Sequence, residues 1–157
     1  MNASFDLQKI QKILDELGAM PGALLPVLHA VQAHAGYVPA EVVPLIAERL
    51  NLSRAEVHGV ISYYHHFHQH PLGKTVVQVC RAEACQSVGA DALAAHAVKE
   101  IGCDFQATSA DGSISLEPVY CLGQCACGPA VMINDDIYAR VTPARLTALL
   151  QQARSKA

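Results

Sequence analysis

Up to residue 70, apolar side chains recur at the three- and four-residue spacing of amphipathic helices, with charged and amide side chains between them. This pattern predicts four short helices, over residues 7–17, 26–36, 39–50 and 53–64. A proline opens the second helix, and Pro44 marks the start of the regular part of the third. Short helices with brief connections are typical of a bundle, so residues 1–70 are expected to form an N-terminal four-helix bundle.

The fourth predicted helix carries its own start signal. Ser53 with Glu56 three residues later forms a capping box, in which each side chain accepts a hydrogen bond from the other residue's backbone N–H. The apolar residues that follow share one helical face: Val57, Val60, Ile61 and Tyr64. The start signal and the apolar face together indicate an amphipathic helix.

After Pro71 the pattern changes to short apolar runs of strand type. The expected elements are a strand over 74–80, a helix over 87–101, a strand over 113–120, a hairpin of 130–133 with 137–141 around Asn134–Asp136, and a last helix from 142 onward. Their order, β-α-β-β-β-α or β-α-β-β-α, is that of a small α/β sandwich. We therefore expect an α/β protein of two domains, 1–70 and 71–157.

Composition adds one hint and several exclusions. Hydrophobic residues make up 52% of the 157 residues and charged residues only 16%, against about 25% in typical soluble proteins, so part of the surface is expected to face another protein. A net charge of −3 provides no basic field for nucleic acid. The start at Met1–Asp6 lacks a secretion signal, and no apolar stretch approaches the roughly 18 residues of a membrane helix. We expect a cytoplasmic protein without direct membrane contact.

Six cysteines in a reducing compartment indicate metal ligands or redox groups rather than structural disulfides. Four of them form two pairs, Cys80 with Cys85 and Cys121 with Cys125, each directly after a predicted strand and each expected in a loop. The spacings are compatible with a [2Fe–2S] cluster, with a zinc site and with thiol redox chemistry. Gly123 lets the backbone approach bridging sulfides closely, which favours the iron–sulfur interpretation.

Three segments together resemble one protein family: Gly59-Val60-Ile61-Ser62-Tyr63-Tyr64, then Val77-Gln78-Val79-Cys80, then Cys121-Leu122-Gly123-Gln124-Cys125 followed by Pro129 and Asn134. They resemble the thioredoxin-like [2Fe–2S] subunit of NADH:quinone oxidoreductase, a family that also includes gamma subunits of soluble NAD-dependent formate dehydrogenases and small diaphorase subunits of NAD-reducing hydrogenases. The resemblance implies a thioredoxin-like [2Fe–2S] ferredoxin domain after the helical bundle, with one cluster on Cys80, Cys85, Cys121 and Cys125. Within the family, residues 80–86 are most similar to the formate dehydrogenase gamma subunit.

The resemblance also implies a function and partners. A [2Fe–2S] centre carries one electron at a time, so the chain is expected to be an electron-transfer subunit of a cytoplasmic NAD-dependent oxidoreductase, with formate dehydrogenase favoured. Its partner is expected to carry flavin and the NAD site, alongside a larger catalytic subunit. No Gly-x-Gly-x-x-Gly motif is present, so substrate turnover by this chain alone is not expected. The alternatives are a zinc-stabilised adaptor, a free-standing ferredoxin, and a peripheral subunit of NADH:quinone oxidoreductase or of an NAD-reducing hydrogenase.

Several reactive side chains stay outside this assignment. Cys127 departs from the family pattern and is a candidate to replace Cys125 as a ligand, although the family position favours Cys125. Cys103, at a predicted helix end, is expected to be a small buried apolar residue. Four histidines cluster just before Pro71, where a solvated or partner-facing connector is favoured over a metal site. They are His65, His66, His68 and His70.

Overall fold

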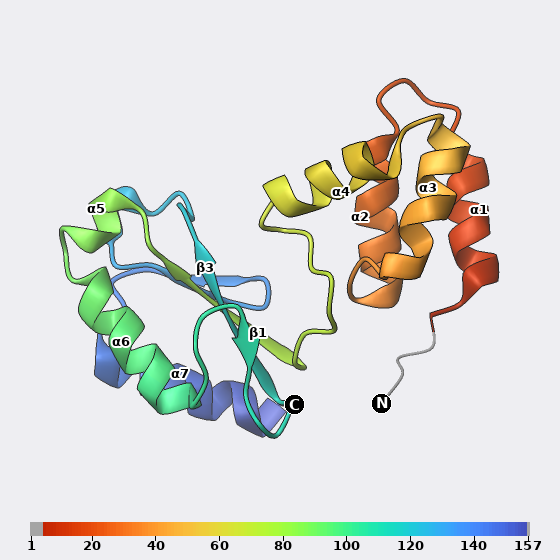
Figure 1. Ribbon diagram of the computed structural model, residues 1–157. Coiled ribbons are helices and arrows are strands. Elements are labelled where there is room, and N and C mark those ends of the chain that lie inside the picture. The colour runs from red at the N-terminus through yellow and green to blue at the C-terminus, as the bar shows by residue number, and fades with distance from the viewer. Residues whose placement is uncertain (1–4, 157) are drawn as a thin grey trace. The chain divides into compact units, whose positions relative to one another are not determined.

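The computed structural model describes residues 5–156 and divides the chain into two compact units, Met1–Pro71 and Leu72–Ala157 (Figure 1). The elements of the first unit are α1 (Leu7–Leu17), α2 (Leu24–Ala35), the 3-10 turn η1 (Ala40–Val42), α3 (Val43–Leu50) and α4 (Arg54–Tyr63). Helix α2 begins before Pro26, which lies in its first turn, where a backbone N–H has no partner within the helix. Pro44 lies in the first turn of α3 for the same reason.

The helices of the first unit enclose a hydrophobic core of their own. Its buried side chains include Ile10, Leu14, Val27, Leu28, Val31, Ile46, Val57 and Ile61. The capping box at the start of α4 is formed as predicted: Ser53 Oγ accepts from the Glu56 N–H at 3.1 Å, and Glu56 Oε2 accepts from the Ser53 N–H at 2.8 Å. This cap fixes where α4 begins.

Three of the four residues of the predicted apolar face of α4 contribute to this core, and Val60 among them is only partly buried. Val57 and Ile61 are buried, whereas Tyr64 lies beyond the end of the helix and is 43% exposed. The neighbouring Tyr63 is 74% exposed. The end of α4 therefore presents aromatic surface that the helical unit itself does not cover.

The second unit is an α/β domain built on a five-stranded sheet, so the predicted α/β fold class is confirmed. Its elements are β1 (Thr75–Cys80), α5 (Glu83–Gln86), α6 (Ala90–Ile101), β2 (Ala107–Thr108), β3 (Ile114–Val119), the 3-10 turn η2 (Cys125–Cys127), β4 (Val131–Ile133), β5 (Asp136–Tyr138) and α7 (Pro143–Lys156). The strand order is β2-β3-β1-β4-β5. Strand β1 runs parallel to β3 and antiparallel to β4. Helices α6 and α7 pack against the sheet around a second core (Figure 1).

The elements of the second unit differ from the prediction at three places. The helix predicted over 87–101 is α6 and begins only at Ala90, because the chain turns at Gly89, whose φ of 102° suits glycine; the short helix α5, before the predicted span, was not predicted. Strand β2 was not predicted, since two residues are too short to show a pattern. Strand β5 is shorter than the predicted 137–141 and begins at Asp136 rather than after it. Within residues 5–156, no helix is both long enough and apolar enough to span a membrane.

Candidate metal centre

The sheet brings the two cysteine pairs to the same edge. Cys80 is the last residue of β1, and its register partner in the parallel neighbour β3 is Val119. Because parallel strands end at the same edge of a sheet, Cys121, which closely follows Val119, lies at the edge where Cys80 lies. Cys85 belongs to the short helix α5 rather than to a loop as predicted, and Cys125 begins the turn η2.

Cys80 and Cys85 form the buried half of the site. They are 1% and 2% exposed and lie in a small apolar cluster with Ala90 and Ala130. Burial raises the pKa of the Cys85 thiol, and its hydrogen bond with Cys80 raises it further. These two sulfurs are therefore shielded from water.

Cys121 and Cys125 form the exposed half. Their Sγ atoms lie 3.5 Å apart, and the Gly123 N–H donates to Cys121 Sγ at 3.3 Å. That backbone hydrogen bond is the main reason why the pKa of the Cys121 thiol is lowered. Gly123 has a φ of +75°, and a Cβ atom there would meet nothing within 4 Å. Glycine is therefore suited to this position by its backbone conformation.

The two halves are packed together by Gly128. A Cβ atom at Gly128 would lie 3.4 Å from Cys85 Sγ and 2.9 Å from Cγ2 of Val88. Cys125 interacts electrostatically with both Cys80 and Cys85. The four predicted ligands are thus gathered at one place. Sequence reasoning did not single out Gly128, although a glycine before Pro129 in a cysteine loop was an available signal.

The donor set fits a cluster with two thiolate ligands on each metal. Two sulfurs bound at about 2.3 Å to one tetrahedral metal lie about 3.8 Å apart, close to the 3.5 Å that separates the Cys121 and Cys125 sulfurs. A second pair of thiols, on Cys80 and Cys85, completes a set of four. Among the described residues, no three or more His, Cys, Asp and Glu side chains are arranged around a single metal ion, so the four thiols form two pairs rather than one four-ligand group.

Of the two charged residues between the first ligands, Arg81 is held in place by its neighbours and Glu83 is exposed. Nη2 of Arg81 lies 3.2 Å from Oδ1 of Asp91, and the guanidinium lies 5.3 Å from the centre of the Phe105 ring. Its Nε is buried and has no hydrogen-bond partner among the residues of the structure that are described. Arg81 therefore holds a fixed positive charge beside Cys80.

The two remaining cysteines have different surroundings. Cys127 lies in η2, where its N–H donates to the Gln124 carbonyl at 2.9 Å and its carbonyl accepts from the Arg140 N–H at 2.8 Å. Cys103 is half-buried against the second core, its thiol lies 3.6 Å from the Ala107 carbonyl, and burial raises its pKa. Cys127 thus shares the loop of the candidate ligands, and Cys103 lies outside the site.

The histidine segment is more firmly attached than a solvated connector. Both ends of the Gln32 amide bind it: Nε2 donates to the His66 carbonyl at 2.7 Å, and Oε1 accepts from the His68 N–H at 2.8 Å. The intervening Phe67 is buried in the helical core, and the His29 ring lies 5.1 Å from that of His66. This segment therefore belongs structurally to the helical unit.

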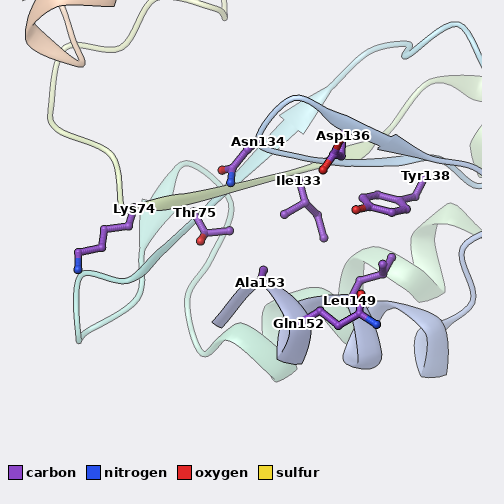
Figure 2. Close-up of a pocket in the computed structure, with 9 residues that line it drawn as sticks. All are labelled: Lys74, Thr75, Ile133, Asn134, Asp136, Tyr138, Leu149, Gln152 and Ala153. Carbon is purple, nitrogen blue, oxygen red and sulfur yellow. The ribbon is translucent and has the colours of Figure 1, made fainter. Parts of the chain in front are cut away.

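Hollows also lie away from the cysteines. In the second unit, a cavity of about 230 Å³ opens between the β4–β5 turn and α7, where Thr75 and Ile133 face Leu149 and Ala153 (Figure 2). In the first unit, an apolar groove of about 480 Å³ runs along α4. The groove is lined by Leu24, Leu52, Glu56, Gly59, Val60, Tyr63 and Tyr64. Its lining overlaps the Gly59–Tyr64 segment that carries part of the family resemblance.

Comparison with known proteins gives a consistent result across most of the chain. The sequence model of one protein family, described as thioredoxin-like [2Fe-2S] ferredoxin, matches residues 10–154. The chain is 34% identical over 146 residues to the NADP-reducing hydrogenase subunit HndA of Solidesulfovibrio fructosivorans, covering 92% of this chain and 85% of that one. It is 35% identical over 134 residues to the NADH-quinone oxidoreductase subunit 2 of Thermus thermophilus, covering 85% and 74%.

The fold is similar to part of a solved oxidoreductase. An NAD⁺-reducing [NiFe]-hydrogenase in the air-oxidized state superposes with a TM-score of 0.70 over 85% of this chain, at 22% sequence identity. The match covers 23% of that hydrogenase chain, so the comparison concerns one portion of a longer polypeptide. At this identity the likeness establishes the fold.

Proposed function

This chain belongs to the thioredoxin-like [2Fe-2S] ferredoxin family, and from that premise we propose that Cys80, Cys85, Cys121 and Cys125 bind one [2Fe–2S] cluster through which the chain serves as an electron-transfer subunit. Members of this family carry one such cluster. The observation that supports the ligand assignment is the convergence of two thiol pairs, one from each cysteine segment, at one edge of the sheet. The predicted division into a helical bundle (1–70) and a thioredoxin-like domain (71–157) is part of the same proposal.

When bound, a [2Fe–2S] centre takes up and releases one electron at a time. The residues of this chain hold and shield it unequally. Cys80 and Cys85 keep water from one side, because they are buried, whereas Cys121 and Cys125 lie at the surface. Surface ligands suit exchange with a redox group on another protein, since no further layer of this chain separates them from an approaching partner.

Exposed apolar side chains accompany the surface ligands. Tyr120, directly before Cys121, is 62% exposed, and Val88, beside Gly128, is 53% exposed. We expect this surface to meet the subunit that carries flavin and the NAD site, with a larger catalytic subunit in the same complex. The apolar groove along α4 is proposed as a second contact with that flavoprotein. Tyr63 and Tyr64 line the groove, and both side chains are exposed on the isolated chain.

The identity of the complex that contains this chain is less closely defined than its electron-transfer role. The relatives compared above are named as subunits of a hydrogenase and of NADH-quinone oxidoreductase. The finer proposal, the gamma subunit of a cytoplasmic NAD-dependent formate dehydrogenase, is supported by the similarity of residues 80–86 alone. Affinity purification of the tagged chain from its native cells, with mass spectrometry of the co-purifying subunits, distinguishes the three complexes.

Anaerobic purification with iron, sulfide and zinc analysis tests the cluster itself. About two iron and about two sulfide per chain, with an EPR signal after reduction, are expected. Stoichiometric zinc without sulfide contradicts the proposal and favours the zinc-stabilised adaptor. An intact cluster in a chain that purifies without partners favours a free-standing ferredoxin.

A further inference from the structure

The two thiol pairs differ in how easily a dissolved molecule reaches them. The side chains of Cys121 and Cys125 are exposed. Those of Cys80 and Cys85, by contrast, are 1% and 2% exposed and lie in an apolar cluster. Thiol–disulfide exchange requires direct contact between the protein sulfur and the sulfur of the incoming disulfide. A dissolved disulfide therefore has access to Cys121 and Cys125, and the buried pair is protected from it.

The two exposed sulfurs are also close enough to bond with each other. Their Sγ atoms lie 3.5 Å apart, and a disulfide bond is about 2.05 Å long, so the sulfurs must approach by about 1.5 Å. Both side chains lie at the surface, where rotation about the Cα–Cβ bonds supplies such a movement without displacing buried atoms. The pair is thus arranged so that it can be joined.

The surrounding loop favours Cys121 over Cys127 as the partner of Cys125. Gly123, between the two exposed cysteines, has open space beside it, because a Cβ atom there would meet nothing within 4 Å. Cys127 is partly buried, and its backbone is held on both sides: its N–H donates to the Gln124 carbonyl at 2.9 Å, and its carbonyl accepts from the Arg140 N–H at 2.8 Å. The segment from 121 to 125 is therefore freer to adjust.

We propose that Cys121 and Cys125 form a reversible disulfide in the cluster-free chain, so that the cluster is loaded only when this pair is reduced. The second part rests on the ligand assignment above. A [2Fe–2S] cluster in an all-cysteine site needs four thiolates. The disulfide withdraws two of them and leaves only Cys80 and Cys85.

The oxidant in this reaction is a small disulfide such as oxidised glutathione. One cysteine sulfur, as its thiolate, attacks the glutathione disulfide, forms a mixed disulfide and releases one glutathione thiolate. The second cysteine sulfur then attacks the protein sulfur of the mixed disulfide, closes the bond between Cys121 and Cys125 and releases the other glutathione. Two cysteine thiols are oxidised, one glutathione disulfide is reduced to two thiols, and these take up the two protons that the cysteines lose. Exposed disulfides are reduced easily, so the reverse reaction needs only a thiol.

Thiol counting on the cluster-free, full-length chain tests the disulfide. The chain is equilibrated anaerobically in glutathione buffers with an increasing oxidised fraction, quenched in acid, unfolded and alkylated with iodoacetamide. We expect the native chain to lose two alkylatable thiols, and peptide mapping by mass spectrometry to link Cys121 to Cys125. Cys125→Ser should lose this link and retain at most a glutathione adduct on Cys121. Cys127→Ser, the matched control in the same loop, should keep the link.

The mapping of the native chain needs no variant to fold well. A native chain that keeps all six thiols in the most oxidising buffer overturns the inference. A link between Cys125 and Cys127, or between Cys80 and Cys85, overturns it as well.

Cluster transfer from a loaded donor protein, followed by visible circular dichroism without added thiol, tests the consequence for loading. The reduced chain should take up the cluster, whereas the oxidised chain should do so only after a dithiol reductant is added. Equal uptake by both forms overturns the inference. A reduced chain that takes up no cluster contradicts the proposed function instead, so the two failures are distinguishable.

Discussion

Cys121 and Cys125 bring their sulfurs to within 3.5 Å of each other across a turn that Gly123 closes with a left-handed backbone. Cys121 itself has a φ of 123°, a conformation that residues with a Cβ atom rarely adopt. Strained backbone of this kind persists where the surrounding structure enforces it, commonly at functional sites. Cys127 does not belong to this pair, although it lies in the same loop.

Separate serine substitutions at Cys125 and Cys127 test which of them is the fourth ligand. Cys125→Ser should lose most of the iron or change the visible and EPR spectra, because one of four thiolates is replaced by a harder oxygen. Cys127→Ser should keep the native iron content and spectra. A normal cluster in Cys125→Ser, together with a loss in Cys127→Ser, reverses the assignment.

Gly128→Ala should weaken the packing between the two halves of the site. The new Cβ atom meets Val88 Cγ2 at 2.9 Å and Cys85 Sγ at 3.4 Å, and overpacking of this kind typically costs about 1–3 kcal/mol. We expect a lower urea midpoint and a smaller iron content per chain than in the native protein.

The matched control is a double variant that combines Gly128→Ala with Val88→Ala. Removing Val88 Cγ2 opens the tighter of the two contacts, so the double variant should recover part of the lost stability. Equal loss in the single and double variants contradicts the proposed contact.

Gly59→Ala separates the folding of the helical unit from partner binding. Gly59 lies inside α4, and a Cβ atom there meets nothing within 4 Å, so alanine should stabilise the isolated chain by up to about 1 kcal/mol. The same methyl group enters the apolar groove and should weaken binding of the flavoprotein subunit. Denaturation and pull-down experiments on one variant measure the two effects. Unchanged binding by a stabilised variant excludes the groove as a contact.

Asp111 should make the folding stability of the second unit depend on pH in the acid range. Its carboxylate accepts hydrogen bonds from the Ser109 hydroxyl and from the Ser113 hydroxyl and N–H, which lower its pKa to about 2. Because the folded pKa lies below the unfolded value of about 3.9, this stabilisation is fully present above about pH 4 and is lost as the pH falls toward 2.

The measurement is the urea midpoint of the cluster-free chain and of Asp111→Asn across this range. The native chain should be the more stable of the two near about pH 5, and the difference should shrink as the pH approaches about 2. A difference that does not change with pH shows that the carboxylate charge is not its source.

The sequence predicted those elements whose signal, a cap or an apolar pattern, extends over several residues. The capping box of Ser53 and Glu56 and the strand that ends at Cys80 were both identified, because local hydrogen bonding and β-branched runs leave a signal in the sequence. The start of α6 after Gly89, rather than at residue 87, was missed, since a glycine near a helix start is ambiguous without its φ angle. Strand β2 exists only through its pairing with β3.

At the site, the sequence predicted which cysteines pair and that each pair follows a strand. It did not predict that Cys85 lies in a helix, or that Phe105 and Asp91 fix the Arg81 side chain, because these contacts join segments that only the folded sheet brings together.

Strand β1 lies between two neighbours, and this limits how far the proposed ligand Cys80 can move. The Cys80 N–H donates to the Ala130 carbonyl at 3.0 Å on one side, and the next N–H, of Arg81, donates to the Val119 carbonyl at 2.7 Å on the other. Because the backbone that carries the Cys80 sulfur is held on both sides, the sulfur has little freedom to rearrange. For a cluster bound through Cys80 we therefore expect a small reorganisation energy, which favours fast electron exchange even when donor and acceptor differ little in potential.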